Sequence, residues 1–395
     1  MKMKRDYFSS NFKLGILGGG QLGKMLLTET RQYDIHTCVL DPSIAAPCRI
    51  GSNEFFVGDL KDFDAVYNFG KKVDVLTIEI EHVNVEALEK LEAEGIEVHP
   101  APALLKIIQN KAKQKTFYRL NAIPTSEFAI FDSKDAVKNA IANGQWTPPF
   151  VWKSAEGGYD GFGVAVIKSI NDIDLIGEGA CLLEKFVPFE KELAVIVARN
   201  PSGEVAAYPV VEMEFHPTAN QVEYVLCPAN ITDETAAAAR ELAINTANAF
   251  SLTGLLAVEM FLTKDGQLLI NEVAPRTHNS GHLSIENNYT SQFEQHLRAV
   301  LDMPLGSTQL KMPAVMANLV GEAGFSGDVI YQGYQDLLHM PGVNIHIYGK
   351  KETRPFRKMG HVTVIGNTLE EARKLAEKAK EKIKVISLKS PEAHT

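Results

Sequence analysis

The chain reads Leu255-Leu-Ala-Val-Glu-Met-Phe-Leu262, then Thr263-Lys-Asp-Gly266, then Gln267-Leu-Leu-Ile-Asn-Glu-Val-Ala274. An Asp-Gly pair between two apolar runs is a strong short-range signal for a β-hairpin. If Asp265 and Gly266 form a two-residue turn, Lys264 pairs with Gln267. Counting outward from that pair places Glu259 directly opposite Glu272. The sequence therefore predicts two glutamates on the same face of one hairpin.

Two like charges that face each other destabilise a sheet, so this pair needs an explanation. A divalent cation supplies one, because Mg²⁺ binds one or two carboxylates together with water and substrate phosphates. The alternative is a pair of solvated surface glutamates. Arg276, His278 and Asn279 follow within seven residues of Glu272 and add groups that bind anions or handle protons. We therefore predict that Glu259 and Glu272 hold Mg²⁺ beside a site for phosphate and a small anion.

Length and composition are those of a globular protein with more than one domain. The chain has 395 residues, of which 45% are hydrophobic and 23% are charged. At roughly 100 to 200 residues per domain, two or three domains are expected. No apolar run approaches the ~18 residues that a membrane span needs, and the basic N-terminus lacks the apolar region of a signal peptide. We expect a cytoplasmic protein with no membrane partner.

Cysteine spacing and net charge exclude two further classes of site. The four cysteines form no C-x-x-C pair and no close Cys/His group, which indicates reduced structural thiols rather than zinc ligands or disulfides. The net charge of −9 argues against a nucleic-acid partner, because binding to a phosphate backbone needs a broad basic surface. An anionic small substrate would need a local basic cluster.

The first hundred residues alternate between strand and helix patterns, which predicts a small parallel sheet that ends near Pro102. A strand over 13–17 leads into glycines in G-x-G-x-x-G spacing at Gly18, Gly20 and Gly23, followed by a helix over 24–31. A second strand over 36–40 ends at Asp41. This pattern is typical of an NAD site, or of tight strand-to-helix packing in a related α/β fold. A strand over 73–78 ends in Glu79-Ile-Glu81-His82, which could bind an amine or hydroxyl or be a solvated loop.

The middle of the chain contains a second glycine-rich loop. Residues 104–120 are predicted to be helical, and their lysines are typical of a solvated face. A strand over 150–153 ends at Lys153 and enters the loop 154–163. A lysine beside a flexible glycine loop suits a triphosphate, although such a loop could also be a simple hairpin. We favour the phosphate interpretation. The strand over 180–183 then leads to the segment 184–187 and to Glu192, which together could bind adenine and ribose.

Two features close the chain. Ser291 and Glu294 form a capping-box signal for a helix through Leu301. The stretch 350–358 carries five basic residues between two β-like segments, in a protein that is acidic as a whole. A clamp for a substrate phosphate is a better interpretation of this cluster than a solvated run.

Taken together, these motifs resemble the ATP-grasp enzymes, and within them the N5-carboxyaminoimidazole ribonucleotide synthetases of purine biosynthesis. The resemblance is carried by the segments 15–23, 158–161, 184–187, 271–282 and 291–296 in this order and spacing. Ala274 also fits, since it stands where other ATP-grasp enzymes have a metal-binding asparagine. The resemblance implies an α/β (α+β overall) ATP-grasp fold with three parts. These are a Rossmann-like parallel-sheet domain (1–110), a two-lobed ATP-grasp domain (111–310) and a small β-rich C-terminal domain (311–395).

The resemblance also implies a reaction and roles for individual residues. ATP phosphorylates bicarbonate to carboxyphosphate, and the 5-amino group of aminoimidazole ribonucleotide captures the carboxyl group. Mg²⁺ would be held by Glu259 and Glu272, and bicarbonate or carboxyphosphate by Arg276, His278 and Asn279. The ribonucleotide would be bound by Gln21, Leu22, Glu79, Tyr159, Asp160, Lys351, Arg354, Arg357 and Lys358. ATP would be bound by Lys111, Lys153, Gly158, Tyr159, Asp160, Gly161, Phe162, Gly163, Val164, Glu184, Lys185, Phe186, Val187, Glu192, His216, Asn271 and Glu272. The family often forms homodimers.

The sequence departs from the family pattern in two places. Phe162, Gly163 and Val164 stand where a basic residue, glycine and glutamine are usual, and Lys111 replaces an arginine. Lysine cannot bind a phosphate bidentately as arginine does. The alternatives that the sequence leaves open are another ATP-grasp carboxylate ligase, an NAD-dependent dehydrogenase and a catalytically inactive ATP-binding regulator.

Overall fold

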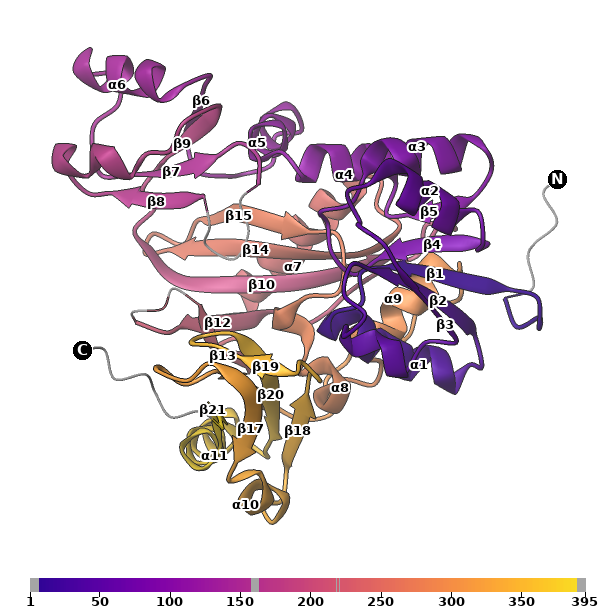
Figure 1. Cartoon of the computed structure of the whole chain (residues 1–395). Helices are drawn as coiled ribbons and strands as arrows, with labels where there is room; N and C mark the ends of the chain where they lie inside the picture. The colour runs from indigo at the N-terminus through magenta and orange to yellow at the C-terminus, as the bar shows by residue number, and fades with distance from the viewer. Residues whose placement is uncertain (1–6, 158–162, 218, 220, 389–395) are drawn as a thin grey trace.

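The structure is a computed structural model, and it describes residues 7–157, 163–217, 219 and 221–388. Three blocks of secondary structure are visible in Figure 1: an N-terminal sheet, a small projecting lobe and a large central sheet that continues into the C-terminal part. Within the described residues, no helix is long and apolar enough to cross a membrane. The predicted site residues 158–162 lie outside the described residues.

The N-terminal block is a parallel sheet in the order β3-β2-β1-β4-β5, as the alternating pattern predicted. Apolar side chains cover both of its faces, which is usual for parallel strands. Helices α2 and α3 pack on one face, and α1 packs on the other together with α9 from the central block. Strand β3 was not predicted from the sequence. The elements are β1 (Lys13–Leu17), α1 (Gln21–Gln32), β2 (His36–Asp41), η1 (Pro47–Ile50), β3 (Glu54–Val57), α2 (Phe63–Gly70), β4 (Val75–Ile78), α3 (Val85–Ala93) and β5 (Glu97–His99).

The continuous helix predicted over 104–120 is wrong, because the chain breaks at Gln109 and Asn110. Asn110 has extended backbone angles, and its side chain accepts a hydrogen bond from Lys113 N (2.9 Å). It therefore caps a new helix, a role that asparagine favours. The two helices are α4 (Pro102–Ile108) and α5 (Lys111–Leu120).

The projecting lobe, at the upper left of Figure 1, is an antiparallel sheet in the order β6-β9-β7-β8. Its core is built from apolar side chains of the sheet and of α6, with Trp152 and Phe150 at its centre. The lobe carries Lys153 near the end of β7. Its elements are β6 (Phe128–Phe131), α6 (Lys134–Ala142), β7 (Phe150–Ser154), β8 (Val164–Ile167), η2 (Ile170–Leu175) and β9 (Cys181–Lys185).

The central sheet runs in the order β15-β14-β10-β12-β13-β16-β20-β18, with β11 beside β10. Alternate residues of β14, such as Val258 and Met260, pack on one face against α7, α4 and α5. Successive strand residues point to opposite faces, so Glu259 lies on the other face. The elements up to residue 300 are β10 (Phe189–Arg199), β11 (Val205–Ala207), β12 (Val211–Phe215), β13 (Val222–Cys227), α7 (Asp233–Ala249), β14 (Gly254–Thr263), β15 (Leu268–Ala274), η3 (Asn279–Gly281), α8 (Ser284–Asn287) and α9 (Gln292–Val300).

The C-terminal part extends this same sheet, because β16 pairs with β13. Helix α11 packs against β16 and β20 around a core that includes Val315, Val362 and Ala376. A smaller sheet in the order β19-β17-β21 lies beside it. The elements are β16 (Ala314–Val320), β17 (Gly327–Gln332), α10 (Tyr334–Leu338), β18 (Val343–Ile347), β19 (Glu352–Thr353), β20 (Lys358–Ile365), α11 (Leu369–Lys382) and β21 (Lys384–Ser387).

Candidate active site

The hairpin of β14 and β15 carries the two glutamates, but its turn differs from the predicted one. Thr263 N donates to Gln267 O (2.9 Å), and Gly266 has a φ of +82°. The loop between the paired residues therefore has three residues instead of two. A β-bulge between Glu259 and Met260 shifts the register by one residue. The two differences cancel, so the predicted pairing of Glu259 with Glu272 is confirmed.

The bulge also turns Asn271 toward the site. Met260 pairs with Ile270 while Glu259 pairs with Glu272, which leaves Asn271 as the extra residue. A bulge redirects a side chain without ending the strand. Asn271 Oδ1 accepts a hydrogen bond from Lys153 Nζ (3.1 Å), and Glu272 Oε2 lies 2.6 Å from Lys111 Nζ. Asn271 thus points toward Lys153 of the projecting lobe, and Glu272 points toward Lys111 of α5.

Electrostatics at the glutamate pair favour a cation. The side chain of Glu259 is 16% exposed and that of Glu272 is 42% exposed. Burial and the charges of Glu272 and Glu192 raise the pKa of Glu259, while the ammonium group of Lys111 lowers the pKa of Glu272. The raised pKa of Glu259 indicates that a second negative charge beside Glu272 is unfavourable unless a cation balances it. Carboxylate oxygens with partial access to solvent are the ligands that Mg²⁺ prefers, so these residues fit that ion.

Lys153 occupies a buried position next to a carboxylate. Its Nζ lies 2.9 Å from Glu184 Oε1, and Lys115 Nζ lies 2.9 Å from the other oxygen of the same carboxylate. Burial would raise the pKa of Glu184, but the charges of Lys153 and Lys115 hold it at about 2. Glu184 is therefore ionised and turned inward. Its side chain does not reach the exposed part of the segment 184–187.

Several other residues predicted to bind ATP lie on or next to β8, β9 and β10. Gly163 has a φ of +71°, which favours glycine, and its carbonyl oxygen accepts a hydrogen bond from Ser154 N (2.8 Å). Val164 pairs with Lys153 across β8 and β7. Lys185 and Phe186 are exposed and Val187 is half-buried, so this segment is open to a ligand. Burial, assisted by the charge of Glu272, raises the pKa of Glu192 to about 7.

Arg276, His278 and Asn279 follow β15 and meet residues of two other elements. Arg276 Nη2 lies 2.8 Å from Glu81 Oε1 at the end of β4, and His278 Nε2 lies 3.3 Å from Glu259 Oε1. Burial and the charge of Arg276 lower the pKa of His278 to about 3, so its imidazole is neutral. Neither amide atom of Asn279 has a hydrogen-bond partner among the described residues. A buried amide of this kind is suited to a polar ligand.

The loop after β15 is held in place by one glutamine. Gln292 Oε1 accepts from His278 N (2.8 Å), and Gln292 Nε2 donates to His278 O (2.7 Å). Gly281 lies so close that an added Cβ would be 2.6 Å from Gln292 Oε1 and 2.2 Å from Ile196 Cδ1. The backbone of His278 is therefore fixed from both sides.

The glycine turn of the N-terminal sheet binds the protein's own carboxylates. Gly19 N donates to Asp41 Oδ2 (2.7 Å), and Leu22 N donates to Glu79 Oε1 (3.3 Å). A dinucleotide site would offer these amides to a pyrophosphate, and Asp41 to a ribose. These contacts therefore favour the alternative interpretation of this turn, tight strand-to-helix packing in a related α/β fold. Gln21 and Leu22 lie beside Glu79. Burial raises the pKa of Glu79, and the charge of the nearby Arg276 opposes this shift.

The basic cluster lies in the connection between β18 and β20 and at the start of β20. Lys358 is close enough to Glu259 and His278 to affect the pKa of both. Arg357 Nη1 donates to Glu352 O (2.7 Å), and Lys351 and Arg354 are exposed. The ring of His216 lies 6.0 Å from that of Phe356 in the same connection. Lys358 therefore lies near the glutamate pair. The other basic residues of the cluster, Lys351, Arg354 and Arg357, lie earlier in the connection between β18 and β20.

Three known families match successive parts of the chain. These are the ribonucleotide synthetase preATP-grasp domain over residues 12–109, the ATP-grasp domain over 116–293 and the phosphoribosylaminoimidazole carboxylase C-terminal domain over 314–375. N5-carboxyaminoimidazole ribonucleotide synthase of Bacillus subtilis is 36% identical over 89% of this chain and 90% of its own length. The chain belongs to this family of ATP-grasp enzymes.

Solved structures of the same ATP-grasp family have this fold. The crystal structure of N5-carboxyaminoimidazole ribonucleotide synthetase from Thermotoga maritima is 43% identical, with a TM-score of 0.87 over 95% of this chain and 99% of that one. The Aspergillus clavatus enzyme in complex with ADP and 5-aminoimidazole ribonucleotide is 35% identical, with a TM-score of 0.84 over 92% and 96%. Longer relatives named phosphoribosylaminoimidazole carboxylase also match. This chain spans 64% of the length of the chloroplastic one from Vigna aconitifolia.

Two residues of this ATP-grasp site were not among those predicted. Lys115 was expected on a solvated helix face, yet it is 2% exposed. Its spacing from Lys111 and from the buried Tyr118 places all three on one face of α5, a signal that the sequence did contain. Glu81 was noted at the end of a strand but was given no role. Its contact with Arg276 links residues far apart in the chain, which no local pattern reveals.

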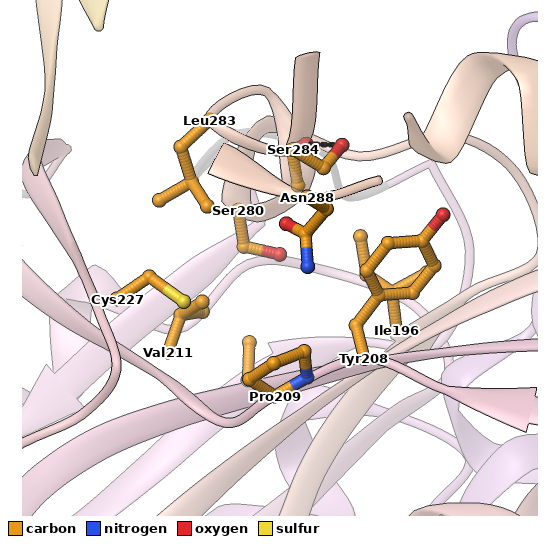
Figure 2. A pocket seen from close by; sticks show the side chains of 11 residues that line it. Ile196, Tyr208, Pro209, Val211, Cys227, Ser280, Leu283, Ser284 and Asn288 are labelled. Atoms are coloured by element: carbon orange, nitrogen blue, oxygen red, sulfur yellow. Dashed lines mark hydrogen bonds between the residues drawn. The ribbon is translucent and has the colours of Figure 1, made fainter. Parts of the chain in front are cut away.

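A small cavity lies behind the loop that contains Ser280. Figure 2 shows that Ile196 and Val211 from the central sheet face Ser280 and Asn288 across it. The volume in which the centre of a water molecule fits is about 10 Å³. That is room for about one water molecule, so this cavity cannot hold a substrate.

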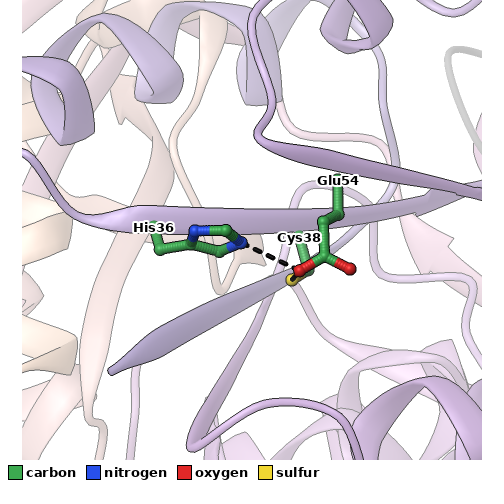
Figure 3. Close-up of side chains that lie close together, drawn as sticks. All are labelled: His36, Cys38 and Glu54. Atoms are coloured by element: carbon green, nitrogen blue, oxygen red, sulfur yellow. Dashed lines mark hydrogen bonds and ion pairs between the residues drawn. The ribbon is translucent and has the colours of Figure 1, made fainter. Parts of the chain in front are cut away.

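A second group of metal-ligating residues lies away from the ATP-grasp site. His36, Cys38 and Glu54 come together on the N-terminal sheet, with His36 Nε2 2.9 Å from Glu54 Oε1 (Figure 3). The expectation that no cysteine belongs to a close Cys/His group is therefore wrong for Cys38. Lys13 Nζ already lies 2.6 Å from the same carboxylate oxygen. An ammonium group in this position competes with a cation, so the cluster is explained as an ion-pair network.

Proposed function

We propose that the chain is an ATP-dependent ligase that joins bicarbonate to the 5-amino group of aminoimidazole ribonucleotide, releasing ADP and phosphate. One observation carries this proposal. The facing glutamates, the buried Lys153 and the run of Arg276, His278 and Asn279 meet at the same edge of the central sheet. Separate sites for a cation, for phosphates and for a small anion are thereby brought together. The membership of the chain in the N5-carboxyaminoimidazole ribonucleotide synthetases supports the choice of substrates.

ATP would lie between the projecting lobe and the central sheet. Lys153 and Lys111 supply positive charge for its phosphates, and the exposed segment 185–187 supplies backbone groups for adenine. Mg²⁺ would be held by Glu259 and Glu272, and when bound it neutralises charge on the transferring phosphoryl group. Glu192 is well placed for the adenosine side, since it lies on β10 next to β14.

Bicarbonate would bind beside the glutamate pair. Arg276 offers a guanidinium group, and Asn279 offers a buried amide with no partner among the described residues. A bicarbonate oxygen attacks the γ-phosphorus of ATP, a new O–P bond forms, and the bond to the ADP oxygen breaks. His278 is neutral, so it can donate one N–H without adding charge.

The second step consumes the carboxyphosphate. The 5-amino nitrogen of the ribonucleotide attacks the carboxyl carbon, an N–C bond forms, and the C–O bond to phosphate breaks. The amine passes one proton to the departing phosphate. Glu79, Gln21 and Leu22 would close the ribonucleotide pocket from the N-terminal side, and Lys358 with Lys351, Arg354 and Arg357 would bind the ribonucleotide from the other.

An omission experiment tests this function. ADP release is measured with the complete mixture, then without bicarbonate and without the ribonucleotide. We expect turnover only in the complete mixture. Turnover that is indifferent to both omissions would defeat the proposal, and turnover with formate or an amino acid in place of bicarbonate would favour another ATP-grasp ligase. Glu272→Ala should abolish turnover while the exposed control Glu241→Ala retains it, and activity in Glu272→Ala would overturn the metal assignment.

A further inference from the structure

Lys115 is the most deeply buried lysine near the site, and nothing in the proposed reaction uses it. It is 2% exposed, Glu184 is 3% exposed and Lys153 is 8% exposed. Its ammonium group contacts Thr125 Oγ1 (2.5 Å), Ser126 Oγ (3.1 Å) and Glu184 Oε2 (2.9 Å). Three acceptors account for the three N–H donors of a lysine. Lys115 therefore has no donor left for a ligand.

Lys153 is in the opposite situation. Among the described residues its ammonium group contacts Glu184 Oε1 (2.9 Å) and Asn271 Oδ1 (3.1 Å). At least one of its N–H donors remains for a phosphate oxygen. The two lysines thus share one carboxylate, each on its own oxygen.

The position of Lys115 is tied to β15, the strand that carries Glu272. Thr125 Oγ1, which accepts from Lys115, donates in turn to Ile270 O (2.6 Å). Ser126 Oγ donates to Glu184 Oε2 (2.5 Å), so it holds the same oxygen that Lys115 contacts. These bonds connect α5, β9 and β15 at the junction of the two lobes.

We propose that Lys115 is a positioning residue for nucleotide binding. By occupying one oxygen of Glu184, Lys115 leaves the positive charge of Lys153 unneutralised and one of its N–H donors available to the phosphates of ATP. This inference rests on the proposed function and extends it to a residue that does not touch the substrate.

The physical basis of this role is the net charge of the buried cluster formed by Lys115, Lys153 and Glu184. Two ammonium groups and one carboxylate leave one net positive charge facing the nucleotide. Without Lys115, Glu184 and Lys153 would form a neutral pair, and both carboxylate oxygens would draw Lys153 away from the site. Burial lowers the pKa of Lys115 to about 8, although Glu184 opposes the shift, so the group is still mostly protonated at neutral pH.

Three variants and a control test this role by nucleotide binding alone. The dissociation constant for ADP with Mg²⁺ is measured by calorimetry, and folding is checked by thermal melting. Lys115→Met removes the charge while keeping much of the side-chain length. The double variant Lys115→Met with Glu184→Gln restores one net positive charge, on Lys153. Lys115→Arg keeps the charge, and Lys113→Met removes an exposed lysine from the same helix.

The expected results separate a charge effect from a packing effect. Lys115→Met should weaken ADP binding about tenfold, the size of effect of one charged hydrogen bond. The double variant should recover most of that loss, Lys115→Arg should bind more tightly than Lys115→Met, and Lys113→Met should bind as the wild type does. If Lys115→Met does not fold, the double variant still decides the matter.

Three results would overturn the inference: wild-type affinity in Lys115→Met, a double variant that binds as weakly as the single one, or no gain from arginine over methionine. Failure of the wild type to bind ADP would overturn the proposed function and this inference with it. Wild-type binding with any of the three results would overturn the inference alone.

Discussion

Glu81→Gln tests whether the N-terminal sheet positions Arg276, the arginine that we propose to bind the anion. Arg276 Nη2 lies 2.8 Å from Glu81 Oε1, with 19% and 14% of the two side chains exposed. A glutamine has the same shape and still accepts a hydrogen bond, so the change removes charge and little else. Arg276 would then be held less firmly in the orientation that faces bicarbonate.

The size of the effect follows from the geometry. Two unit charges about 4 Å apart interact by about 4 kcal/mol at an effective dielectric of about 20. The partial exposure of both side chains and the retained hydrogen bond reduce this value. We expect a loss of about 1.5 to 2.5 kcal/mol, which corresponds to a decrease of about ten- to seventyfold in kcat/KM for bicarbonate.

The assay follows ADP release while bicarbonate is varied and ATP and ribonucleotide are saturating. Because Glu81 contacts the anion site and not Lys153, the KM for ATP should change by less than about twofold. Glu92→Gln, an exposed position on α3, serves as the control. A folded Glu81→Gln protein with wild-type kcat/KM for bicarbonate would refute the reasoning, and so would an equal loss in the control.

Three further predictions concern charge, packing and metal. The pKa of Glu192 is raised to about 7, so the folded protein holds a proton there that the unfolded chain releases near pH 4.5. Stability from this group is lost as the pH rises toward 7, and in metal-free protein Glu192→Gln should therefore melt higher than wild type at pH 8 but not at pH 4. Equal differences in melting temperature at pH 4 and pH 8 would argue against the raised pKa of Glu192. Gly281→Ala should destabilise the fold by about 1 to 3 kcal/mol, because its Cβ would press on Gln292 and Ile196. Lower kcat should accompany the lower melting temperature, and an unchanged melting curve would contradict the packing. Mg²⁺ should raise the melting temperature of the wild type but not of Glu272→Ala, and an equal rise in both would place the ion elsewhere.

Local patterns predicted much of the fold because strands, turns and caps have local causes. The Asp-Gly signal located the hairpin, and Ser291 does cap its helix by accepting from Glu294 N (3.0 Å). The break at Asn110 was missed because apolar periodicity continues across it, although asparagine is a favoured cap. The exact turn of the hairpin was also wrong, and only the bulge at Asn271 restored the predicted pairing.

The parts of the site that the sequence could not provide depend on contacts between distant segments. Glu184 was predicted to bind ATP. The orientation of its side chain, however, is set by Lys115 and Lys153, which are 69 and 31 residues away in the sequence. The glycine turn has the spacing of a dinucleotide site, and only the fold shows that Asp41 and Glu79 occupy its amides. Long-range ion pairs of this kind leave no periodic trace in a single sequence.

The central claim is that this site transfers a carboxyl group from bicarbonate to an amine at the expense of ATP. The most direct measurement uses isotopically labelled bicarbonate with ATP, Mg²⁺ and aminoimidazole ribonucleotide, and it compares the amounts of ADP, phosphate and label bound to nitrogen. We expect equal amounts of all three in the wild type and none in Glu272→Ala. ADP formed without labelled carbamate, or labelled carbamate formed without ADP, would contradict the account.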